Sequence, residues 1–330
     1  MSQPYEILSF YKFVDIEDPT ALQADLKKLT QTLNMLGTIL LAKEGINGMV
    51  TGSPTDIEVF KSSMHENPLF SDLLFKANLH DQPAFSRMLV KVKNHIITLR
   101  KEVEPTKETG EYLSPKDFLD WQNKNKDMII LDTRNDYEVE MGTFQNAVNP
   151  DIQSFDQFPE WVDQNLENNK KTPIVTFCTG GIRCEKATAY MKQKGFESVY
   201  QLDGGIITYF EETKNDPENN YWVGECTVFD KRKAITKTLE PSTQLICYVC
   251  LTTIKEENLA QQPTKDALCI TCAKSMKESQ EKRTKKGIEK STEFHQKRAN
   301  FLHKERIKYS VKFKEHQNHH STESSTSNSN

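Results

Sequence analysis

Two hydrophobic patterns alternate along the first hundred residues of the chain. An apolar run from Ile7 to Val14 predicts a strand, and leucines at helical spacing after Asp18-Pro19 predict a helix that ends at Gly37. The other elements predicted here are short strands over Thr38–Ala42 and Asn47–Thr51, a helix from Pro54 to about Asn67, and strands over Leu73–Leu79 and Met88–Leu99.

This order of elements places residues 1–100 in the α+β class. We expect a sandwich of the ferredoxin or acylphosphatase type, in which one antiparallel sheet carries two helices on one face. The residues that follow, 101–112, are polar and unpatterned, which predicts a linker.

A second pattern begins at Ser114-Pro115, a pair typical of a helix start. Met128–Asp132 and Pro173–Cys178 are short apolar runs between polar segments, as expected for buried parallel strands. Helices are predicted over Phe155–Leu166, Cys184–Lys194 and Ile206–Thr213. Residues 113–214 are therefore predicted to form an α/β domain with a parallel sheet.

The rest of the chain is polar and increasingly basic. We divide it into a connecting segment (215–245), a four-cysteine module (246–273), and a basic helical segment with a disordered polar tail (274–330). Residues 231–330 hold 20 Lys or Arg against 11 Asp or Glu, whereas residues 1–230 hold 23 against 36. This asymmetry suggests RNA binding, with Lys231, Arg232 and Lys233 as candidate contacts, although a solvated charged helix would look the same.

The composition excludes several classes of protein. The longest mostly apolar run, Met35–Ala42, has eight residues, far below the roughly 20 that cross a bilayer. The first residues lack the basic and apolar regions of a secretory signal. Seven cysteines in 330 residues are too few for a disulfide scaffold. We expect a reduced, cytoplasmic protein with no membrane partner.

The segment from Cys178 to Arg183 carries the clearest chemistry. A buried strand delivers Cys178 to the carboxyl edge of the predicted sheet, and Thr179, Gly180, Gly181 and Ile182 lead from it toward a helix. Glycines let backbone N–H groups point at the sulfur, and the helix start and Arg183 add positive charge. All three effects favour a thiolate, so Cys178 is predicted to be the reactive nucleophile rather than a core residue.

This loop resembles the active-site loop of rhodanese domains, in which the cysteine carries a sulfane sulfur as a persulfide. The Cys-x4-Arg spacing favours that reading over phosphatases, whose loop is one residue longer. The stretches Leu131–Glu138 and Gly142–Ala147 also resemble the rhodanese pattern. Within it, Asp132 and Arg134 are expected to pair and hold loops in place.

Four segments together resemble a more specific family than rhodanese domains in general. These segments are Ala42–Gly48, Cys178–Ala187, Tyr200–Ile206 and Trp222–Asp230. They are similar to the rhodanese-containing tRNA uridine hydroxylase family, over residues 5–272. The resemblance implies an oxidoreductase that makes 5-hydroxyuridine at the wobble position of tRNA, with O2 as co-substrate. It also makes Lys43, Glu44 and Asn47 candidates to face the substrate cleft, unless Gly45–Gly48 is only a hairpin turn.

Two further cysteines have open roles. Cys184 could resolve an oxidised Cys178 by forming a disulfide, or it could donate a hydrogen bond to the loop. Cys226 stands alone after Gly224-Glu225 and is expected to be structural.

The remaining four cysteines form two Cys-x-x-Cys pairs, Cys247 with Cys250 and Cys269 with Cys272. Two such pairs can supply the four thiolates of a closed, structural zinc site. A four-thiolate site leaves no open position for water, so this metal is expected to support the fold rather than catalysis.

The sequence contains no visible flavin or nicotinamide fingerprint. The hydroxylation chemistry is therefore expected to pass through Cys178 as a thiolate or persulfide. Two other functions remain open: a rhodanese sulfurtransferase that supplies a thiolation pathway, and an RNA-binding protein in which the second domain is only a scaffold. The intact nucleophile and arginine of the loop argue against the scaffold.

Overall fold

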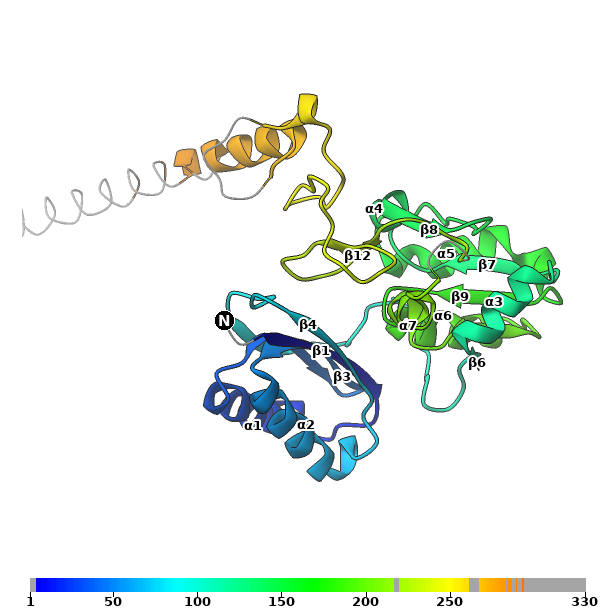
Figure 1. Cartoon of the computed structure of the whole chain (residues 1–330), viewed down its shortest axis with the longest axis horizontal. Helices are drawn as coiled ribbons and strands as arrows, with labels where there is room; N and C mark the ends of the chain where they lie inside the picture. The colour runs from blue at the N-terminus through cyan, green and yellow to red at the C-terminus, as the bar shows by residue number, and fades with distance from the viewer. Residues whose placement is uncertain are drawn as a thin grey trace, which may run out of the picture. The chain divides into compact units, whose positions relative to one another are not determined.

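The structure is a computed structural model, and it describes residues 4–216, 220–260, 267–282, 284–286, 289 and 293. The chain divides into two compact units, Met1–Glu256 and Glu257–Asn330. The first unit contains both predicted domains (Figure 1). In the second unit, residues 270–282 are helical, and the predicted disordered tail lies outside the described residues.

The first domain is a five-stranded sheet with the strand order β4-β1-β3-β2-β5. Its two helices cover the same face of the sheet (Figure 1), and a single hydrophobic core fills the space between them, centred on Leu8, Ile39 and Phe60. The elements are β1 (Tyr5–Phe13), α1 (Pro19–Thr32), β2 (Leu36–Ala42), β3 (Gly45–Gly52), α2 (Pro54–Glu66), β4 (Phe75–His80) and β5 (Met88–Val92).

The sheet differs from the prediction in one pairing. Strand β5 runs parallel to β2, whereas the prediction was one antiparallel sheet, so the prediction was wrong for this one pairing and holds for the other three. The physical reason is the order of the strands: β5 reverses direction after β4, but it lies at the opposite edge beside β2, which runs in the same direction. Strand β5 also ends at Val92, seven residues before the predicted end.

Two predicted boundaries in this domain were wrong as well. Helix α1 is capped by the Asp18 carboxylate as predicted, but it ends at Thr32, because Asn34 adopts a left-handed conformation (φ 48°) and Leu36 already belongs to β2. The hairpin turn falls at Lys43-Glu44, and Gly45–Gly48 are part of strand β3.

The second domain contains a parallel sheet with the strand order β6-β10-β9-β7. The predicted strands correspond to β7 and β9, whereas β6, β10 and α4 were not predicted, and β6 begins inside the predicted linker. The elements are β6 (Glu111–Leu113), α3 (Pro115–Asn123), β7 (Ile129–Asp132), α4 (Asp136–Met141), β8 (Gly142–Phe144), α5 (Phe158–Asn165), β9 (Ile174–Phe177), α6 (Ile182–Gln193), β10 (Val199–Leu202) and α7 (Gly205–Thr213).

The connecting segment folds back onto the second domain. Strand β11 (Trp222–Gly224) pairs with β8, and β12 (Cys226–Thr227) pairs with β13 (Ala234–Ile235). The indole of Trp222 packs edge-on against Phe144 and Phe210, with ring centroids 5.0 and 5.3 Å apart. This aromatic cluster makes the segment part of the domain core.

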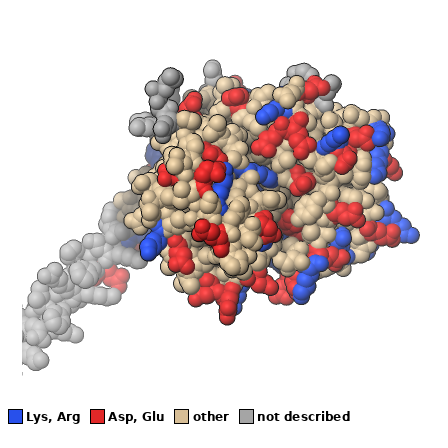
Figure 2. Space-filling view, turned by 60° about the horizontal axis from the view of Figure 1, so that its bottom comes forward, with Lys and Arg blue, Asp and Glu red and all other residues tan. Residues whose placement is uncertain are grey.

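Charges of both signs are mixed on the face shown in Figure 2, where acidic side chains lie among basic ones. Among the described residues, no helix is long and apolar enough to span a membrane.

Candidate active site

Cys178 lies directly after strand β9, at the carboxyl edge of the parallel sheet. Helix α6 begins at Ile182, two residues earlier than predicted, so the loop between strand and helix is only Cys178–Gly181. This edge is where open α/β sheets bind their ligands. The sulfur accepts a hydrogen bond from the backbone N–H of Gly181 at 3.1 Å.

The surroundings of Cys178 favour its thiolate. Burial by itself raises the pKa of this thiol, which is only 1% exposed. A hydrogen bond from Cys184, the charge of Arg183 and the backbone N–H groups of both residues outweigh burial and hold the pKa of Cys178 well below its ordinary value. The group can therefore act as a nucleophile or carry a sulfur atom at neutral pH.

Cys184 has the opposite protonation state. Burial, its hydrogen bond to Cys178 and the negative charge of that sulfur raise the pKa of Cys184 well above its ordinary value. It is therefore a neutral thiol that donates to the Cys178 thiolate. Both roles that the sequence left open, hydrogen-bond donor and resolving thiol, require this proximity of Cys184 to Cys178.

Arg183 does not stand free beside the sulfur. Its guanidinium makes a two-fold ion pair with the Glu138 carboxylate, at 2.6 and 2.8 Å, and the Glu138 side chain is fully buried. Glu138 belongs to helix α4 and was not singled out from the sequence. The only signal in the sequence was its place inside the rhodanese-like stretch Leu131–Glu138. The sequence alone does not show that Glu138 forms an ion pair with Arg183.

Asp132 and Arg134 form a second buried pair beneath the loop. The Arg134 guanidinium donates to both Asp132 oxygens, at 2.9 and 2.7 Å, and to the carbonyl oxygen of Gly142 at 2.6 Å. Thr143 completes the carboxylate's partners at 2.8 Å. Both side chains are fully buried, so their position suits a structural role and gives no access to a substrate.

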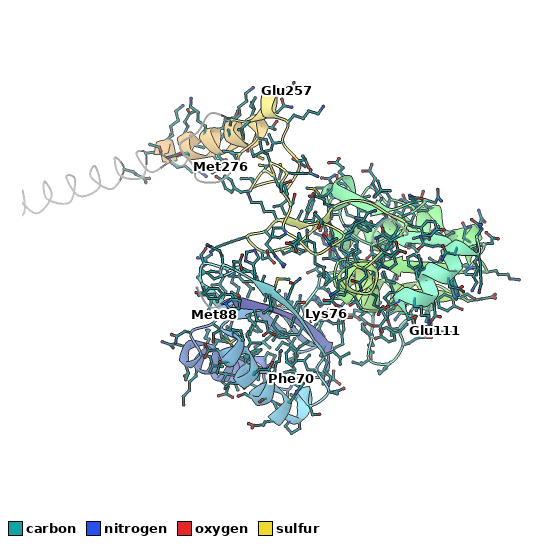
Figure 3. All side chains as sticks on the ribbon, in the orientation of Figure 1. Phe70, Lys76, Met88, Glu111, Glu257 and Met276 are labelled. Carbon is teal, nitrogen blue, oxygen red and sulfur yellow. The ribbon has the colours of Figure 1, made fainter. Side chains whose placement is uncertain are left out.

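The first domain covers the loop from the other side. A Cβ atom added to Gly181 (φ 103°) would lie 2.8 Å from the hydroxyl oxygen of Tyr11, so glycine is required for this close approach. That hydroxyl donates to Glu185 at 3.0 Å. Lys76 extends from strand β4 (Figure 3), and its ammonium donates to the carbonyl oxygens of Gly180 and Gly204, at 2.8 and 2.5 Å.

The sequence did not predict Tyr11 and Lys76 as site residues, because they lie about a hundred or more residues from the loop. Both residues lie in predicted strands, but the sequence pattern does not show what the faces of those strands contact.

The three residues of the first domain that were predicted to face the substrate cleft differ in their surroundings. Lys43 is exposed. The Glu44 carboxylate accepts from the buried Lys186 of α6 at 2.7 Å and from the backbone N–H of Ile96 at 2.8 Å. Asn47 donates to the carbonyl oxygen of Ile96 at 3.3 Å. Both Glu44 and Asn47 therefore bind the segment after β5, and Glu44 also binds the second domain through Lys186.

A small cleft of about 20 Å³ opens next to the loop. Polar side chains from both domains face it, together with Ile7, Met49, Ile207 and Ile235; the polar ones are Ser9, Lys76, Asn78, Glu211 and Arg232. Ile207 is also bonded to the loop through its N–H, which donates to the Thr179 carbonyl oxygen at 3.2 Å. The cleft is therefore adjacent to the Cys178 loop.

The three RNA-contact candidates differ in their exposure and in their hydrogen-bond partners. Lys231 is exposed. Arg232 lines the cleft and is paired with the buried Asp230 at 2.6 Å. Lys233 donates to the carbonyl oxygen of Ile246 at 3.1 Å. Lys231 is thus the member of the three whose ammonium faces solvent.

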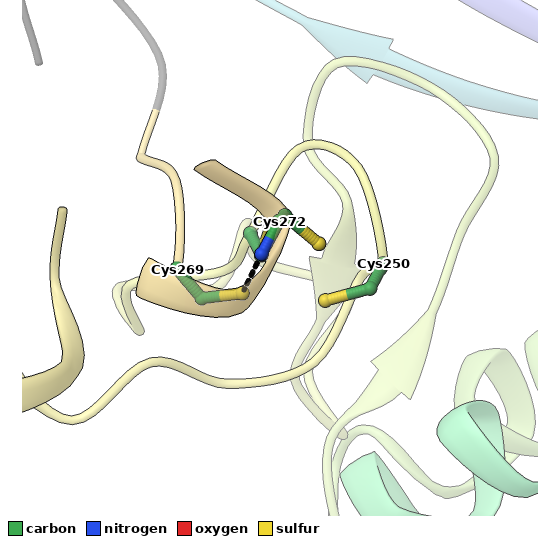
Figure 4. A group of neighbouring side chains, drawn as sticks. Cys250, Cys269 and Cys272 are labelled. Carbon is green, nitrogen blue, oxygen red and sulfur yellow. Dashed lines mark hydrogen bonds between the residues drawn. The ribbon is translucent and has the colours of Figure 1, made fainter. Parts of the chain in front are cut away.

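The sulfur atoms of Cys247, Cys250, Cys269 and Cys272 all lie within 4.8 Å of one another. Figure 4 shows three of them, with the N–H of Cys272 donating to the Cys269 sulfur at 3.4 Å. Four thiolates at this separation match the donor set of a tetrahedral metal site. By contrast, burial raises the pKa of Cys226 to about 12, which makes that thiol unreactive.

Comparison with known domain families agrees with this architecture. Residues 5–96 match the UPF0176 acylphosphatase-like domain, and residues 114–212 match the rhodanese-like domain.

The chain is 37% identical to a tRNA uridine(34) hydroxylase from Acaryochloris marina over 280 residues, which cover 84% of this chain and 89% of that protein. Solved structures give weaker matches. The rhodanese-like domain of an Anabaena protein is 16% identical, with a TM-score of 0.30, over 35% of this chain and 80% of that one. A rhodanese-like protein of Staphylococcus aureus is 25% identical, with a TM-score of 0.26, over 30% and 90%.

Proposed function

Since the chain belongs to the tRNA uridine(34) hydroxylase family, we propose that it is a tRNA-modifying enzyme that hydroxylates C5 of the wobble uridine with dioxygen. The observation that carries this proposal is the Cys178 loop, in which a buried thiolate is held by backbone N–H groups, by Cys184 and by the charge of Arg183. The Cys178 thiolate is a soft, electron-rich nucleophile, and its loop is adjacent to the cleft.

The overall reaction has a simple balance. One oxygen atom of O2 enters the C5–H bond of uracil and the other leaves as water, so two electrons and two protons come from an external reductant. An added dithiol can serve as that reductant in an assay. Within the chain, Cys178 supplies the reactive sulfur, while Arg183 and Cys184 keep it in the thiolate form.

We propose that the uracil base binds at the opening of this small cleft, beside the loop. The base has an apolar face and an edge on which one N–H donor lies between two oxygen acceptors. Around the cleft lie the apolar side chains of Ile7 and Ile207, the amide of Asn78 and the carboxylate of Glu211. Entry of a single base requires that the nucleotide leave its stack, as other enzymes that modify bases require.

The remaining parts of the chain fit binding of a polyanion. Lys231 is exposed within the connecting segment, between β12 and β13, and the basic region that follows that segment can contact phosphates without reading sequence. We further propose that the four-cysteine cluster holds a structural zinc ion and, because the substrate is tRNA, that the enzyme acts in the cytoplasm.

The decisive experiment is nucleoside mass spectrometry of tRNA from cells that lack this gene, complemented with wild type, Cys178→Ser or Cys226→Ser. We expect wild type and Cys226→Ser to restore 5-hydroxyuridine and Cys178→Ser to fail. Purified enzyme supplied with ¹⁸O2 should place the heavy isotope in the product. A label that comes from water instead would contradict the oxygen-dependent reaction.

A rhodanese sulfurtransferase is the second candidate, because the same loop would stabilise a persulfide on Cys178. Thiosulfate turnover that requires Cys178, together with loss of thiolated nucleosides and unchanged 5-hydroxyuridine in the deletion strain, would favour this alternative.

A further inference from the structure

One peptide unit of the Cys178 loop is held at both of its ends. The carbonyl oxygen of Gly180 accepts from the Lys76 ammonium at 2.8 Å, and the N–H of Gly181 donates to the Cys178 sulfur at 3.1 Å. These two groups belong to the same amide, and in a trans peptide they point in opposite directions. A cation that fixes the oxygen therefore also fixes the direction of the N–H.

Without this contact, the amide has considerable freedom. It joins two glycines, and a Cβ atom added to Gly180 would meet nothing within 4 Å. The loop alone therefore does not lock the plane of this peptide. A bond from a charged donor is shorter and stronger than one between neutral groups, and it polarises the amide so that its N–H becomes a better donor.

The same ammonium also holds the neighbouring turn. Lys76 donates to the Gly204 carbonyl oxygen at 2.5 Å, and the next residues pack directly on the loop, since the N–H of Ile206 donates to the Cys178 carbonyl oxygen at 3.0 Å. Gly205 lies so close that an added Cβ would be 2.4 Å from that oxygen. One side chain of the first domain thus joins both turns around the sulfur.

The charges around Lys76 favour a strong interaction between its ammonium and the Cys178 loop. Burial lowers the pKa of Lys76, and the negative charges of Cys178, Asp203 and Glu211 oppose that effect. An ammonium withdrawn from water in this way interacts strongly with the loop.

We propose that Lys76 is a positioning residue for Cys178, through which the first domain orients the Gly180–Gly181 peptide and completes the thiolate site of the second domain. The inference rests on the proposed function only in taking Cys178 as the reactive group. It applies equally to hydroxylation and to sulfur transfer, because it concerns the state of the sulfur.

The test is a pH titration of the ultraviolet absorbance of the Cys178 thiolate in the full chain. Each variant is compared with the same variant carrying Cys178→Ser, so that the cysteines that do not interact with Cys178 cancel, and Lys76→Met and wild type are also compared in a Cys184→Ser background. We expect Lys76→Met to move the midpoint upward by about one pH unit, the lower end of the effect of a nearby opposite charge, which is about a 10-fold loss of thiolate below the midpoint. Lys76→Arg should restore part of the shift.

The matched control is Lys61→Met, because Lys61 belongs to the same domain and pairs with Glu6 and Glu58 instead. Alkylation of the buried Cys226 reports whether a variant has partly unfolded. An unchanged midpoint in Lys76→Met, with Cys226 still protected, would overturn the inference. Because the titration needs no tRNA, failure of the hydroxylase proposal would leave this result intact.

Discussion

The ammonium of Lys186, on helix α6, donates to both carboxylate oxygens of Glu44 in the first domain, at 2.7 and 2.8 Å. Lys186 is 2% exposed, so the docking of the two domains encloses its charge. The adjacent residue, Glu185, accepts from Tyr11 at 3.0 Å. Two successive side chains of the helix that follows the Cys178 loop therefore attach the first domain to the second.

The ion pair between Lys186 and Glu44 is expected to contribute to stability. Lys186→Met should lower the free energy of unfolding by about 1 to 3 kcal/mol, less than a fully buried pair would cost because part of the Glu44 side chain is exposed. Urea unfolding, in a double-mutant cycle with Glu44→Gln, measures the coupling. Lys124→Met removes the exposed pair with Asp120 and should change stability by less than about 1 kcal/mol. Equal effects of the two Lys variants would contradict the prediction.

Variants of Cys184 separate the donor role from the resolving role. Cys184→Ser keeps a hydrogen-bond donor near the Cys178 sulfur and should retain activity, whereas Cys184→Ala should lower it. Losing the donor raises the pKa of Cys178 toward its ordinary value, so the activity profile of Cys184→Ala should shift to higher pH. Quantifying 5-hydroxyuridine across pH tests this. If both variants were inactive at every pH, a disulfide with Cys178 would be required instead.

The buried pair of Glu138 and Arg183 predicts a pH-dependent loss of stability. Burial raises the pKa of Glu138, but the charge and hydrogen bonds of Arg183 outweigh it and hold that pKa below its ordinary value. The stabilisation is therefore present above the ordinary carboxyl range and is lost as the pH falls through the lower, folded-state pKa.

Glu138→Gln should accordingly cost about 3 to 5 kcal/mol near pH 7, because Arg183 is left as a buried, unpaired charge. The difference from wild type should narrow in acid, which urea unfolding at several pH values would reveal. Glu160→Gln, an exposed change on α5, serves as the control. A difference that stays constant down to pH 3 would show that the pair is not the cause.

Metal analysis tests the four-cysteine cluster. We expect about one zinc ion per purified chain, lost in Cys250→Ser and retained in Cys226→Ser, because only the first of these cysteines belongs to the cluster. Removing the metal with a chelator should also unfold the module, since such sites often fold only with their ion. A wild-type chain without bound zinc, or full zinc content in Cys250→Ser, would argue against the site.

Most elements of both domains could be predicted from local patterns. Leucine spacing after the Asp18 cap predicted α1, and the apolar runs before Asp132 and Cys178 predicted β7 and β9. Errors arose where position in the sheet decides the structure. Leu36 continued the helical spacing but belongs to β2, and β5 is parallel to β2 because of its place at the edge of the sheet.

The sequence by itself determined the sulfur loop, since Cys178, the two glycines and Arg183 are contiguous and their backbone geometry is local. Only the tertiary structure decided what surrounds that loop. Glu138 forms an ion pair with Arg183, and Lys76 donates to the carbonyl oxygen of Gly180, across separations of 45 and 104 residues. The first pair depends on how α4 and α6 pack within the second domain, and the second on how the two domains dock. Both are set by packing and desolvation over a whole interface rather than by the spacing of residues along the chain.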